Sequence, residues 1–278
     1  MKGDTGMSDM VDTPAGRLPV VKMDRRELLM GLAAGTVVPL VAGCTAHNEA
    51  LGRSQLMIVS DAQIAQLSQQ TWQQSLQQER VSRDAGKRRQ VERVGTRIAQ
   101  GSGLTQYDWE FVVFENDQIN AWVLPNGKVA IYSGLLDVVG NDDQLATVIG
   151  HEAGHVAGRH AQERASQQMA AGMGASLAAV ALDQGGVDNA GMWAGVLGAG
   201  LTFGVLLPYS RRHEYEADRL GADYMTRSSY RASEALTFWN GMMARSSRGS
   251  QPAFLSTHPS DAQRMQALDA HIRASGYA

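Results

Sequence analysis

The stretch QLATVIGHEAGHVAGRH, residues 144–160, decides the fold. Its apolar residues recur every three or four positions, which predicts one helix that carries three histidines and a glutamate. On a helix, residues four apart lie on one face, so the imidazoles of His151 and His155 can bind one metal ion. Glu152 lies one position further round the helix, where it can hold and deprotonate a water molecule beside that metal.

A His-Glu-x-x-His pattern also arises by chance on surface helices whose polar side chains are solvated. Here the neighbouring residues indicate a buried helix, in which unpaired histidines would be costly. These apolar or small neighbours are Val148, Ile149, Ala153, Gly154 and Val156.

The first candidate for a third ligand is His160. In metzincins a third histidine follows the second by six residues, and that position here is Ala161. A shift of one residue rotates a helical side chain by a large angle, so we expect His160 to miss the metal. We expect it to lie behind the ligands or at the surface.

The second candidate lies downstream, in RRHEYEADRLGADYM, residues 211–225. Glu214 and Asp218 share one face of a predicted helix, which suits a carboxylate ligand and a second carboxylate that orients a ligating histidine. Such a pair by itself is typical of a solvated helix face. The two histidines of the first motif change this interpretation. Two histidines and one glutamate, with a fourth position left open, are the composition of a catalytic zinc site.

Composition limits the class of protein. With 278 residues the chain can form one domain and a targeting segment, or two small domains, and one domain is the simpler interpretation. The net charge of −3, with both signs mixed along the chain, excludes the basic surface of a nucleic-acid-binding protein. The single cysteine excludes an internal disulfide and a CxxC zinc site, so any metal is held by His, Asp and Glu.

The segment MDRRELLMGLAAGTVVPLVAGC, residues 23–44, has the basic, apolar and small-residue order of an export signal. Its last four residues resemble a lipobox, in which Cys44 would be acylated; a short buried helix with a chance cysteine is the alternative. Arg25 and Arg26 resemble a twin-arginine signal, although an ordinary export signal also carries basic residues. Translation could start at any of four methionines: Met1, Met7, Met10 or Met23.

We therefore predict an export signal over residues 1–43, a lipid-anchored tether without regular structure over 44–60, and one folded domain over 61–278. Thr45, rather than an aspartate, follows the cysteine, which favours the outer membrane. The protein would then face the periplasm.

Within the domain we predict helices over 61–81 and 88–103, then three strands over 109–117, 119–125 and 126–134. The last two strands would form a hairpin at Pro125-Asn126-Gly127. Asp142 or Asp143 would cap the helix that carries the motif. Residues 190–208 approach the length of a membrane span, but their glycines favour packed, buried helices. Helices from residue 210 onward should break near 245–252 and 255–261, giving a mainly helical α+β fold.

Three motifs in order resemble a known family. HEAGH at 151–155, EYEAD at 214–218 and LSTHPSDAQR at 255–264 are similar to the gluzincin metallopeptidases of the HtpX, Oma and CAAX prenyl endopeptidase type. The lipobox makes the chain most similar to their periplasmic lipoprotein branch, which includes LoiP and BepA. The resemblance runs from about Val91 to Arg264, takes in residues 120–136, and leaves the glycine-rich segment 170–207 without a counterpart.

The resemblance implies a zincin-type metalloprotease domain with one Zn²⁺ per chain. His151, His155 and Glu214 would be its ligands, Glu152 the general base and Asp218 the partner that orients a ligand. A short strand beside the active-site helix would add an extended substrate to the sheet edge. That strand comprises Asn120, Ala121, Trp122 and Val123.

His258 has two possible roles in this family. It either takes the position of the attacking water and keeps the enzyme latent, or donates a hydrogen bond to the transition state. His213 is a second candidate donor. Arg264 either anchors the loop that carries His258 or is an ordinary surface arginine.

The expected function is that of a zinc-dependent endopeptidase of the bacterial cell envelope, which cleaves unfolded or misassembled proteins as quality control. The alternative is a lipid-anchored periplasmic chaperone or assembly factor with a latent zinc site. A purely structural lipoprotein would bind no zinc. The sequence makes no prediction of the natural substrate or of the oligomeric state.

Overall fold

The computed structural model describes residues 10–13, 16–19, 44–181, 209–249 and 252–277. In the first two ranges β1 (Met10–Thr13) and β2 (Gly16–Pro19) pair as an antiparallel hairpin. Most of the predicted export signal and the apolar run 190–208 lie outside the described residues. Among the described helices, none combines the length and the apolar character needed to cross a membrane.

A three-stranded sheet lies at the centre of the domain. It consists of β5 (Glu110–Phe114), β6 (Ala121–Val123) and β7 (Lys128–Tyr132), in the order β5-β7-β6. The predicted hairpin of β6 and β7 is confirmed, and its turn uses Gly127 at a φ of 84°, a backbone conformation that glycine adopts without steric cost. β5 pairs in parallel with β7, which leaves β6 at one edge of the sheet.

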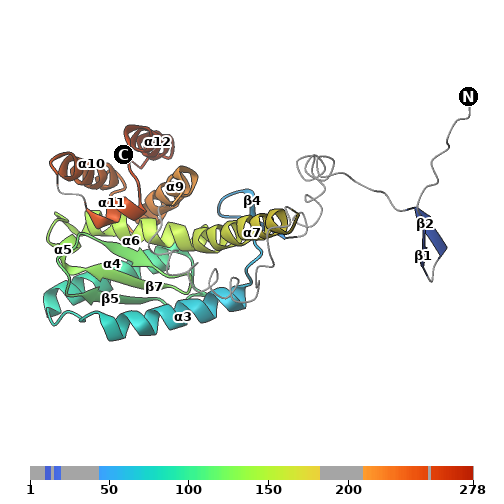
Figure 1. Ribbon diagram of the computed structural model, residues 1–278. Coiled ribbons are helices and arrows are strands. Elements are labelled where there is room, and N and C mark those ends of the chain that lie inside the picture. The colour runs from blue at the N-terminus through green and yellow to red at the C-terminus, as the bar shows by residue number, and fades with distance from the viewer. Residues whose placement is uncertain (1–9, 14–15, 20–43, 182–208, 250–251, 278) are drawn as a thin grey trace, which may run out of the picture.

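Helices cover both faces of this sheet. Successive side chains along β6 point to opposite faces, so the strand packs against helices on each side. Trp122 points to the face covered by α3 (Asp61–Gln78), where its ring centroid lies 5.8 Å from that of Trp72. Ala121 and Val123 point to the opposite face and join the main core with α4 (Ala85–Ser102) and α6 (Asp142–Ala157). Figure 1 shows the sheet between α3 and α6.

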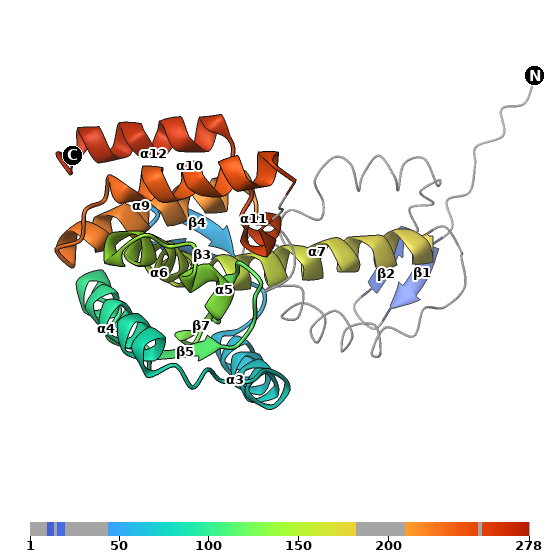
Figure 2. The same cartoon turned by 90° about the vertical axis from the view of Figure 1, so that its left-hand side faces the viewer.

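The helix that carries the motif is shorter than expected. Its cap is Asn141, whose side chain accepts a hydrogen bond from the amide of Gln144 at 2.9 Å, and not Asp142 or Asp143. The helix ends at Ala157, because Arg159 takes a positive φ of 50°. A second helix, α7 (His160–Ala181), then runs away from the helical body (Figure 2), so the prediction of one unbroken helix is wrong.

From residue 209 onward the structure describes four helices: α9 (Arg211–Arg227), α10 (Glu234–Ser247), α11 (Ala253–Thr257) and α12 (Ala262–Ala274). They break at both predicted places and also at residues 228–233. The short α5 (Ser133–Leu136) links β7 to the loop before α6. The fold is therefore mainly helical with a small three-stranded sheet, as predicted.

Helix α9 lies unusually close to α6. A Cβ atom at Gly154 would lie 2.6 Å from the carbonyl oxygen of Ala217, and one at Gly221 would lie 2.9 Å from the amide nitrogen of His151. Glycine at these points allows the two backbones to approach each other. This contact brings the motif on α6 beside the carboxylates on α9.

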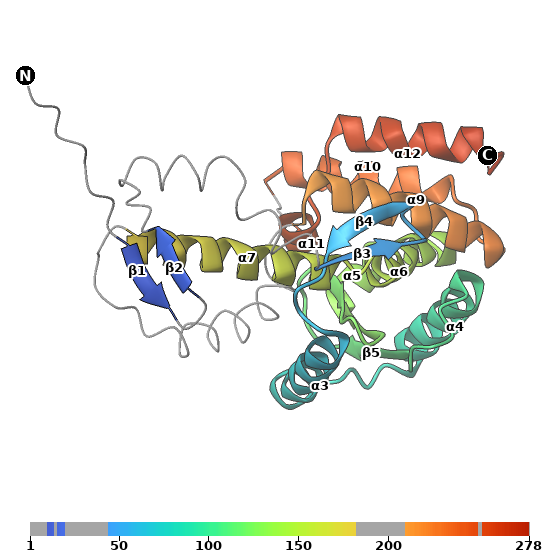
Figure 3. The ribbon, with the colours of Figure 1, turned by 90° about the vertical axis from the view of Figure 1, so that its right-hand side faces the viewer.

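The segment predicted to be an irregular tether forms a β-hairpin, and that prediction is wrong. Strands β3 (Thr45–Asn48) and β4 (Arg53–Leu56) pair in antiparallel fashion and pack beside α6 and α9 (Figure 3). The side chain of Asn48 donates to the carbonyl of Ala157 at 3.0 Å, and that of Gln55 donates to the carbonyl of Gly158 at 2.7 Å. The hairpin thus satisfies carbonyl groups at the end of α6.

Candidate metal centre

Four buried side chains from three elements point at one spot. Each of His151 and His155 on α6, Glu214 on α9 and His258 after α11 offers one ligand atom, and these four atoms lie within 4.8 Å of one another. The Nε2 atoms of His151 and His155 are 3.1 Å apart, and each lies 3.4 Å from a carboxylate oxygen of Glu214. The structure therefore brings together the three predicted ligands, and adds His258.

The donor atoms fit a zinc ion. With bonds of about 2.0–2.1 Å, the edges of a tetrahedral zinc site are about 3.3 Å long. The Nδ1 atom of His151 lies 2.9 Å from Asp218, which it contacts as donor, so its Nε2 atom presents a lone pair to the spot. His155 presents its own Nε2 atom to the same spot. Two ring nitrogens that face each other in this way, beside an ionised carboxylate, are suited to share a metal ion.

Asp218 contacts His151, as the predicted orienting partner of a ligand would. Its Oδ1 atom lies 2.9 Å from Nδ1 of His151, and its carboxylate accepts hydrogen bonds from the Arg264 guanidinium at 2.5 and 2.8 Å. Such a contact fixes the tautomer and the ring orientation of a ligating histidine. Arg264 also pairs with Glu214 at 2.7 Å and lies over the ring of Trp239 at 3.9 Å.

Arg264 anchors the loop that carries His258. Its Nη1 atom donates to the carbonyl oxygens of Pro259 at 3.0 Å and of His258 at 3.4 Å. The arginine is only 1% exposed, so the alternative of a surface arginine is wrong. Helix α11 fixes the other side of the loop, because the amide of Phe254 donates to the carbonyl of Ile119, just before β6.

Glu152 lies beside the ligands and faces His258. Its Oε1 atom is 3.3 Å from Nε2 of His258. This oxygen is buried and accepts no hydrogen bond from the described residues. Burial raises the pKa of Glu152, and the histidines nearby only partly oppose that effect. Glu152 is thus a buried carboxylate with a free acceptor atom at the predicted reaction site.

The electrostatics of the site favour a positive charge at its centre. Burial by itself lowers the pKa of His151, but Glu214 and Asp218 outweigh this effect and raise the pKa to about 9. Burial also acts on Glu214, yet Arg264, His258 and His151 together hold its pKa well below the usual range. The carboxylate is therefore ionised and available to a cation.

His160 is buried behind His155, so of the two expected positions the one behind the ligands is correct. Its Nδ1 atom lies 2.9 Å from Nδ1 of His155, and its Nε2 atom lies 3.1 Å from Glu216. Burial lowers the pKa of His160 to about 4. His213 stacks on His160 at 4.5 Å and contacts Glu163 at 3.2 Å, outside the group of convergent ligand atoms.

Sequence reasoning missed Tyr209. Its ring stacks on that of His155 at 4.0 Å between centroids and lies 5.4 Å from that of His258, while the guanidinium of Arg164 covers it at 4.2 Å. Burial raises its pKa above the ordinary value. A lone tyrosine after an apolar run carries no motif, so only the packing of the chain reveals its place.

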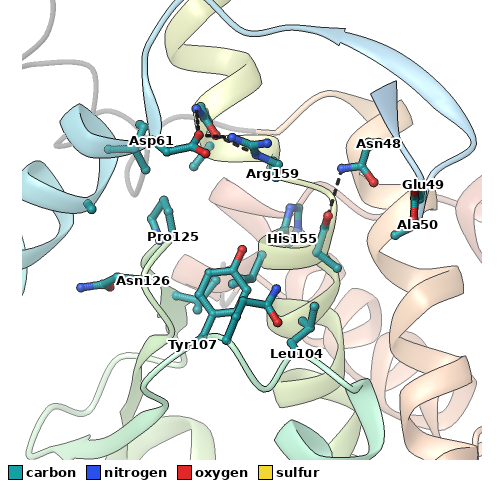
Figure 4. A pocket seen from close by; sticks show the side chains of 18 of the residues that line it. Asn48, Glu49, Ala50, Asp61, Leu104, Tyr107, Pro125, Asn126, His155 and Arg159 are labelled. Carbon is teal, nitrogen blue, oxygen red and sulfur yellow. Dashed lines mark hydrogen bonds and ion pairs between the residues drawn. The ribbon is translucent and has the colours of Figure 1, made fainter. Parts of the chain in front are cut away.

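A cavity of about 560 Å³ opens beside the metal centre. The end of β6, the β6–β7 turn, α3, the β3–β4 hairpin and the end of α6 line it, and His155 and Tyr209 belong to both the cavity and the metal centre. Figure 4 shows Tyr107 and Pro125 facing the space, with the ion pair of Arg159 and Asp61 at its rim. Most of the lining residues are uncharged, and the charged ones are Glu49, Asp61, Asp108 and Arg159.

Comparisons with known proteins agree with this geometry. The model of peptidase family M48 matches residues 85–272. Mitochondrial metalloendopeptidase OMA1 of Schizosaccharomyces pombe is 36% identical over 180 residues, which cover 64% of this chain and 51% of that protein. The mitochondrial metalloendopeptidase OMA1 of Bos taurus is 28% identical over 274 residues, covering 90% and 50%.

The beta-barrel assembly-enhancing protease of Escherichia coli is 28% identical over 193 residues, covering 66% of this chain and 38% of that protein. The chain spans about half the length, or less, of these relatives. Because these relatives include mitochondrial and bacterial proteins, the assignment of this chain to the periplasmic lipoprotein branch stays a prediction. The family match covers both helices that supply the predicted ligands, and the chain therefore belongs to peptidase family M48.

Proposed function

We propose that the protein is a zinc-dependent endopeptidase of the cell envelope that cleaves unfolded or misassembled proteins. The observation that carries the proposal is the convergence of His151, His155 and Glu214 beside the buried carboxylate of Glu152. Two histidines and one glutamate, with a carboxylate next to them, are the groups that metal-assisted peptide hydrolysis requires.

Each side chain has a definite task in this reaction. When bound, zinc supplies Lewis acidity, which polarises the scissile carbonyl and lowers the pKa of water beside it. The free Oε1 atom of Glu152 accepts the proton of the attacking water and later delivers it to the leaving amine. Asp218 keeps His151 in the tautomer that presents Nε2 to the metal, and Arg264 holds Asp218 in place.

The substrate path in this proposal runs along β6. The strand lies at the sheet edge, so an extended peptide can pair with it in antiparallel fashion. Such a peptide would place its amino-terminal part beside Val123 and Pro125, next to the cavity. The apolar residues among its lining, such as Ile64, Leu104 and Val123, suit a large apolar side chain of an unfolded polypeptide, which a folded protein would keep buried.

We further propose that His258 keeps the enzyme latent. Its Nδ1 atom lies 3.1 Å from Nε2 of His151 and 3.2 Å from Oε1 of Glu214, as a fourth ligand would. Its Nε2 atom faces Glu152, where the attacking water would be. Of the two roles implied by the family resemblance, this geometry supports the one in which His258 takes the position of the water.

The proposed location is the periplasmic side of the envelope, where a lipid on Cys44 would anchor the protein in the outer membrane. The lipobox-like residues 41–44 support this, and the described hairpin begins directly after Cys44. The likeness to a bacterial beta-barrel assembly-enhancing protease supports unfolded or misassembled envelope proteins as substrates. Export by the twin-arginine route is part of the same proposal.

The test is zinc-dependent cleavage of an unfolded protein by the full chain, run beside Glu152→Gln. Because the variant retains all the proposed ligands, we expect zinc to bind both proteins and cleavage to occur only with the parent. Equal cleavage by both would remove Glu152 from the mechanism. Absence of cleavage by both, with one zinc bound per chain, would favour a latent or chaperone-like protein.

The chaperone alternative has one observation in its favour, namely that His258 fills the fourth position of the site. An assembly factor of this kind would keep its cellular role when Glu152 is replaced. Complementation of a deletion strain by Glu152→Gln therefore separates the two functions, because a protease would lose its role.

A further inference from the structure

Behind the metal centre, a row of side chains leads from a ligand to the β3–β4 hairpin. His155 contacts His160 at 2.9 Å through their Nδ1 atoms, and Nε2 of His160 contacts Oε2 of Glu216 at 3.1 Å. Glu216 in turn accepts hydrogen bonds from Nε and Nη2 of Arg53 at 2.6 and 2.7 Å. Four residues from α6, α7, α9 and β4 thus form one continuous path.

Only one arrangement of the protons along this path leaves Nε2 of His155 free to bind a metal. A ligand nitrogen must be unprotonated, so His155 with Nε2 at the metal carries its proton on Nδ1 and donates it to His160. His160 accepts at Nδ1, carries its own proton on Nε2 and donates it to Glu216. A fixed, ionised Glu216 therefore selects the tautomer and the ring orientation of His155.

Arg53 is the group that fixes Glu216. Its planar guanidinium pairs with both oxygens of Glu216 and, at 2.8 Å each, with both oxygens of Glu163 on α7. The side chains of Arg53, Glu163 and Glu216 are only 11%, 7% and 14% exposed. Such two-pronged pairs restrict geometry in a way that a single point charge does not.

The hairpin is well placed for this task. Asn48 and Gln55 bond the carbonyl groups of Ala157 and Gly158, at the end of the helix that carries His155. The hairpin comprises residues 45–56, and the family match begins only at residue 85. It therefore lies outside the region that the family model describes.

We infer that Arg53 is a positioning residue for the ligand His155, acting through Glu216 and His160, and that the hairpin is part of the metal centre. This inference rests on the proposed zinc site. It makes the segment next to the predicted lipid anchor a determinant of how tightly the zinc is held.

The test measures zinc affinity of the full chain by competition with a chromophoric chelator. Arg53→Met keeps the length of the side chain and removes its charge, and Arg53→Lys keeps the charge without the planar fork. Loss of such an outer partner typically weakens metal binding about 10–100-fold, which we expect for Met, with an intermediate loss for Lys. The control is Arg93→Met, which removes the exposed pair with Asp142 and should leave affinity unchanged.

Three further comparisons separate positioning from a general loss of structure. In a His160→Gln background the path is already broken, so Arg53→Met should add little to the loss of zinc affinity. Glu216→Gln removes the ionised acceptor through which Arg53 acts, and should weaken zinc binding at least as much as Arg53→Met. The visible absorption of the Co²⁺-loaded protein should change in Arg53→Met and stay unchanged in Arg93→Met, because only the former alters ligand geometry.

Zinc affinity that is equal in the parent, Arg53→Met and Arg93→Met would overturn the inference while leaving the proposed protease intact. Losses that simply add in the Arg53→Met and His160→Gln double variant would also overturn it, since the two residues would then act separately. A parent chain that binds no zinc would instead refute the metal centre, and the inference with it.

Discussion

At the scale of single residues, Arg264 pairs with two buried carboxylates beside the metal centre. Its buried guanidinium neutralises Asp218 and Glu214 together. In Arg264→Met both carboxylates lose this partner in a dry interior, so we expect the metal-free protein to lose about 3–5 kcal/mol of unfolding free energy. Denaturant titration with chelator present measures this.

The matched control for that experiment is Arg93→Met. The ion pair of Arg93 with Asp142 is solvent-exposed, so the unfolding free energy should fall by no more than about 1 kcal/mol. Similar losses in both variants would mean that the burial of Arg264 has no energetic consequence.

His258 gives the second prediction at this scale. In His258→Ala the fourth position of the site becomes accessible and Glu152 loses its neighbour, so cleavage of an unfolded protein should rise about tenfold or more, a free-energy change of ~1.4 kcal/mol in the barrier. Initial rates at saturating zinc provide the measurement. A fall in rate with zinc retained would make His258 a hydrogen-bond donor to the transition state, and an unchanged rate would remove both roles.

At the scale of elements, the close contact of α6 with α9 sets the geometry of the site. A methyl group at Gly154 would meet the backbone oxygen of Ala217 at 2.6 Å. We expect Gly154→Ala to cost about 1–3 kcal/mol by overpacking, more than the ~1 kcal/mol that alanine gains in helix propensity. The melting temperature and the zinc affinity of the variant should both be lower than those of the parent.

Gly241→Ala on α10 is the control for this substitution. An added Cβ there meets nothing within 4 Å, so the higher helix propensity of alanine should stabilise the protein by up to about 1 kcal/mol. If both variants gained stability, the contact between α6 and α9 would not be tight enough to set the site.

Prediction of the elements from sequence succeeded where local signals were strong. The β6–β7 hairpin was predicted because Asn126 and Gly127 mark its turn, and α4 because Gly103 ends it. The break after Ala157 was missed, since apolar periodicity continues into α7 while the backbone turns at Arg159. The β3–β4 hairpin was missed because its stability comes from contacts with α6, α7 and α9 that lie far away in sequence.

At the scale of the whole molecule, the metal should hold α6, α9 and the His258 loop together. Zinc that binds only the folded state raises stability by about 2.7 kcal/mol at a free concentration of 100 Kd. We therefore expect a chelator to lower the melting temperature and added zinc to restore it. In His151→Gln, which lacks one ligand, the chelator should have a much smaller effect. A melting temperature independent of zinc would contradict the proposed metal centre.

The cavity is also a property of the whole molecule, because six separate segments of the chain line it. Ala65 on α3 lines it, so Ala65→Trp should narrow the space and reduce kcat/KM for an unfolded protein about tenfold, without a change in zinc affinity. Ala62→Trp, on the same helix but outside the cavity, is the control. Equal kcat/KM for both variants would place the substrate elsewhere.

The sequence by itself indicated the chemistry that we propose for this protein. The spacing of His151, Glu152 and His155 needs only the geometry of one helix to face a metal, and the downstream Glu214 and Asp218 supply the missing carboxylates. Local periodicity and turn residues were likewise enough to predict α3, α4 and the three strands of the central sheet. These features depend on short-range backbone geometry, which neighbouring residues control.

Only the tertiary structure decided how the site is completed. It placed His258 as a fourth donor, made His160 a buried partner of His155, and connected that pair to Arg53 on an unexpected hairpin. The contacts of His258 with His151 and of Arg53 with Glu216 join segments more than a hundred residues apart, which no local pattern predicts. The contact of His155 with His160 crosses the break between α6 and α7, which apolar periodicity did not predict. They form only when packing of glycine-rich helix faces and pairing of buried charges bring those segments together.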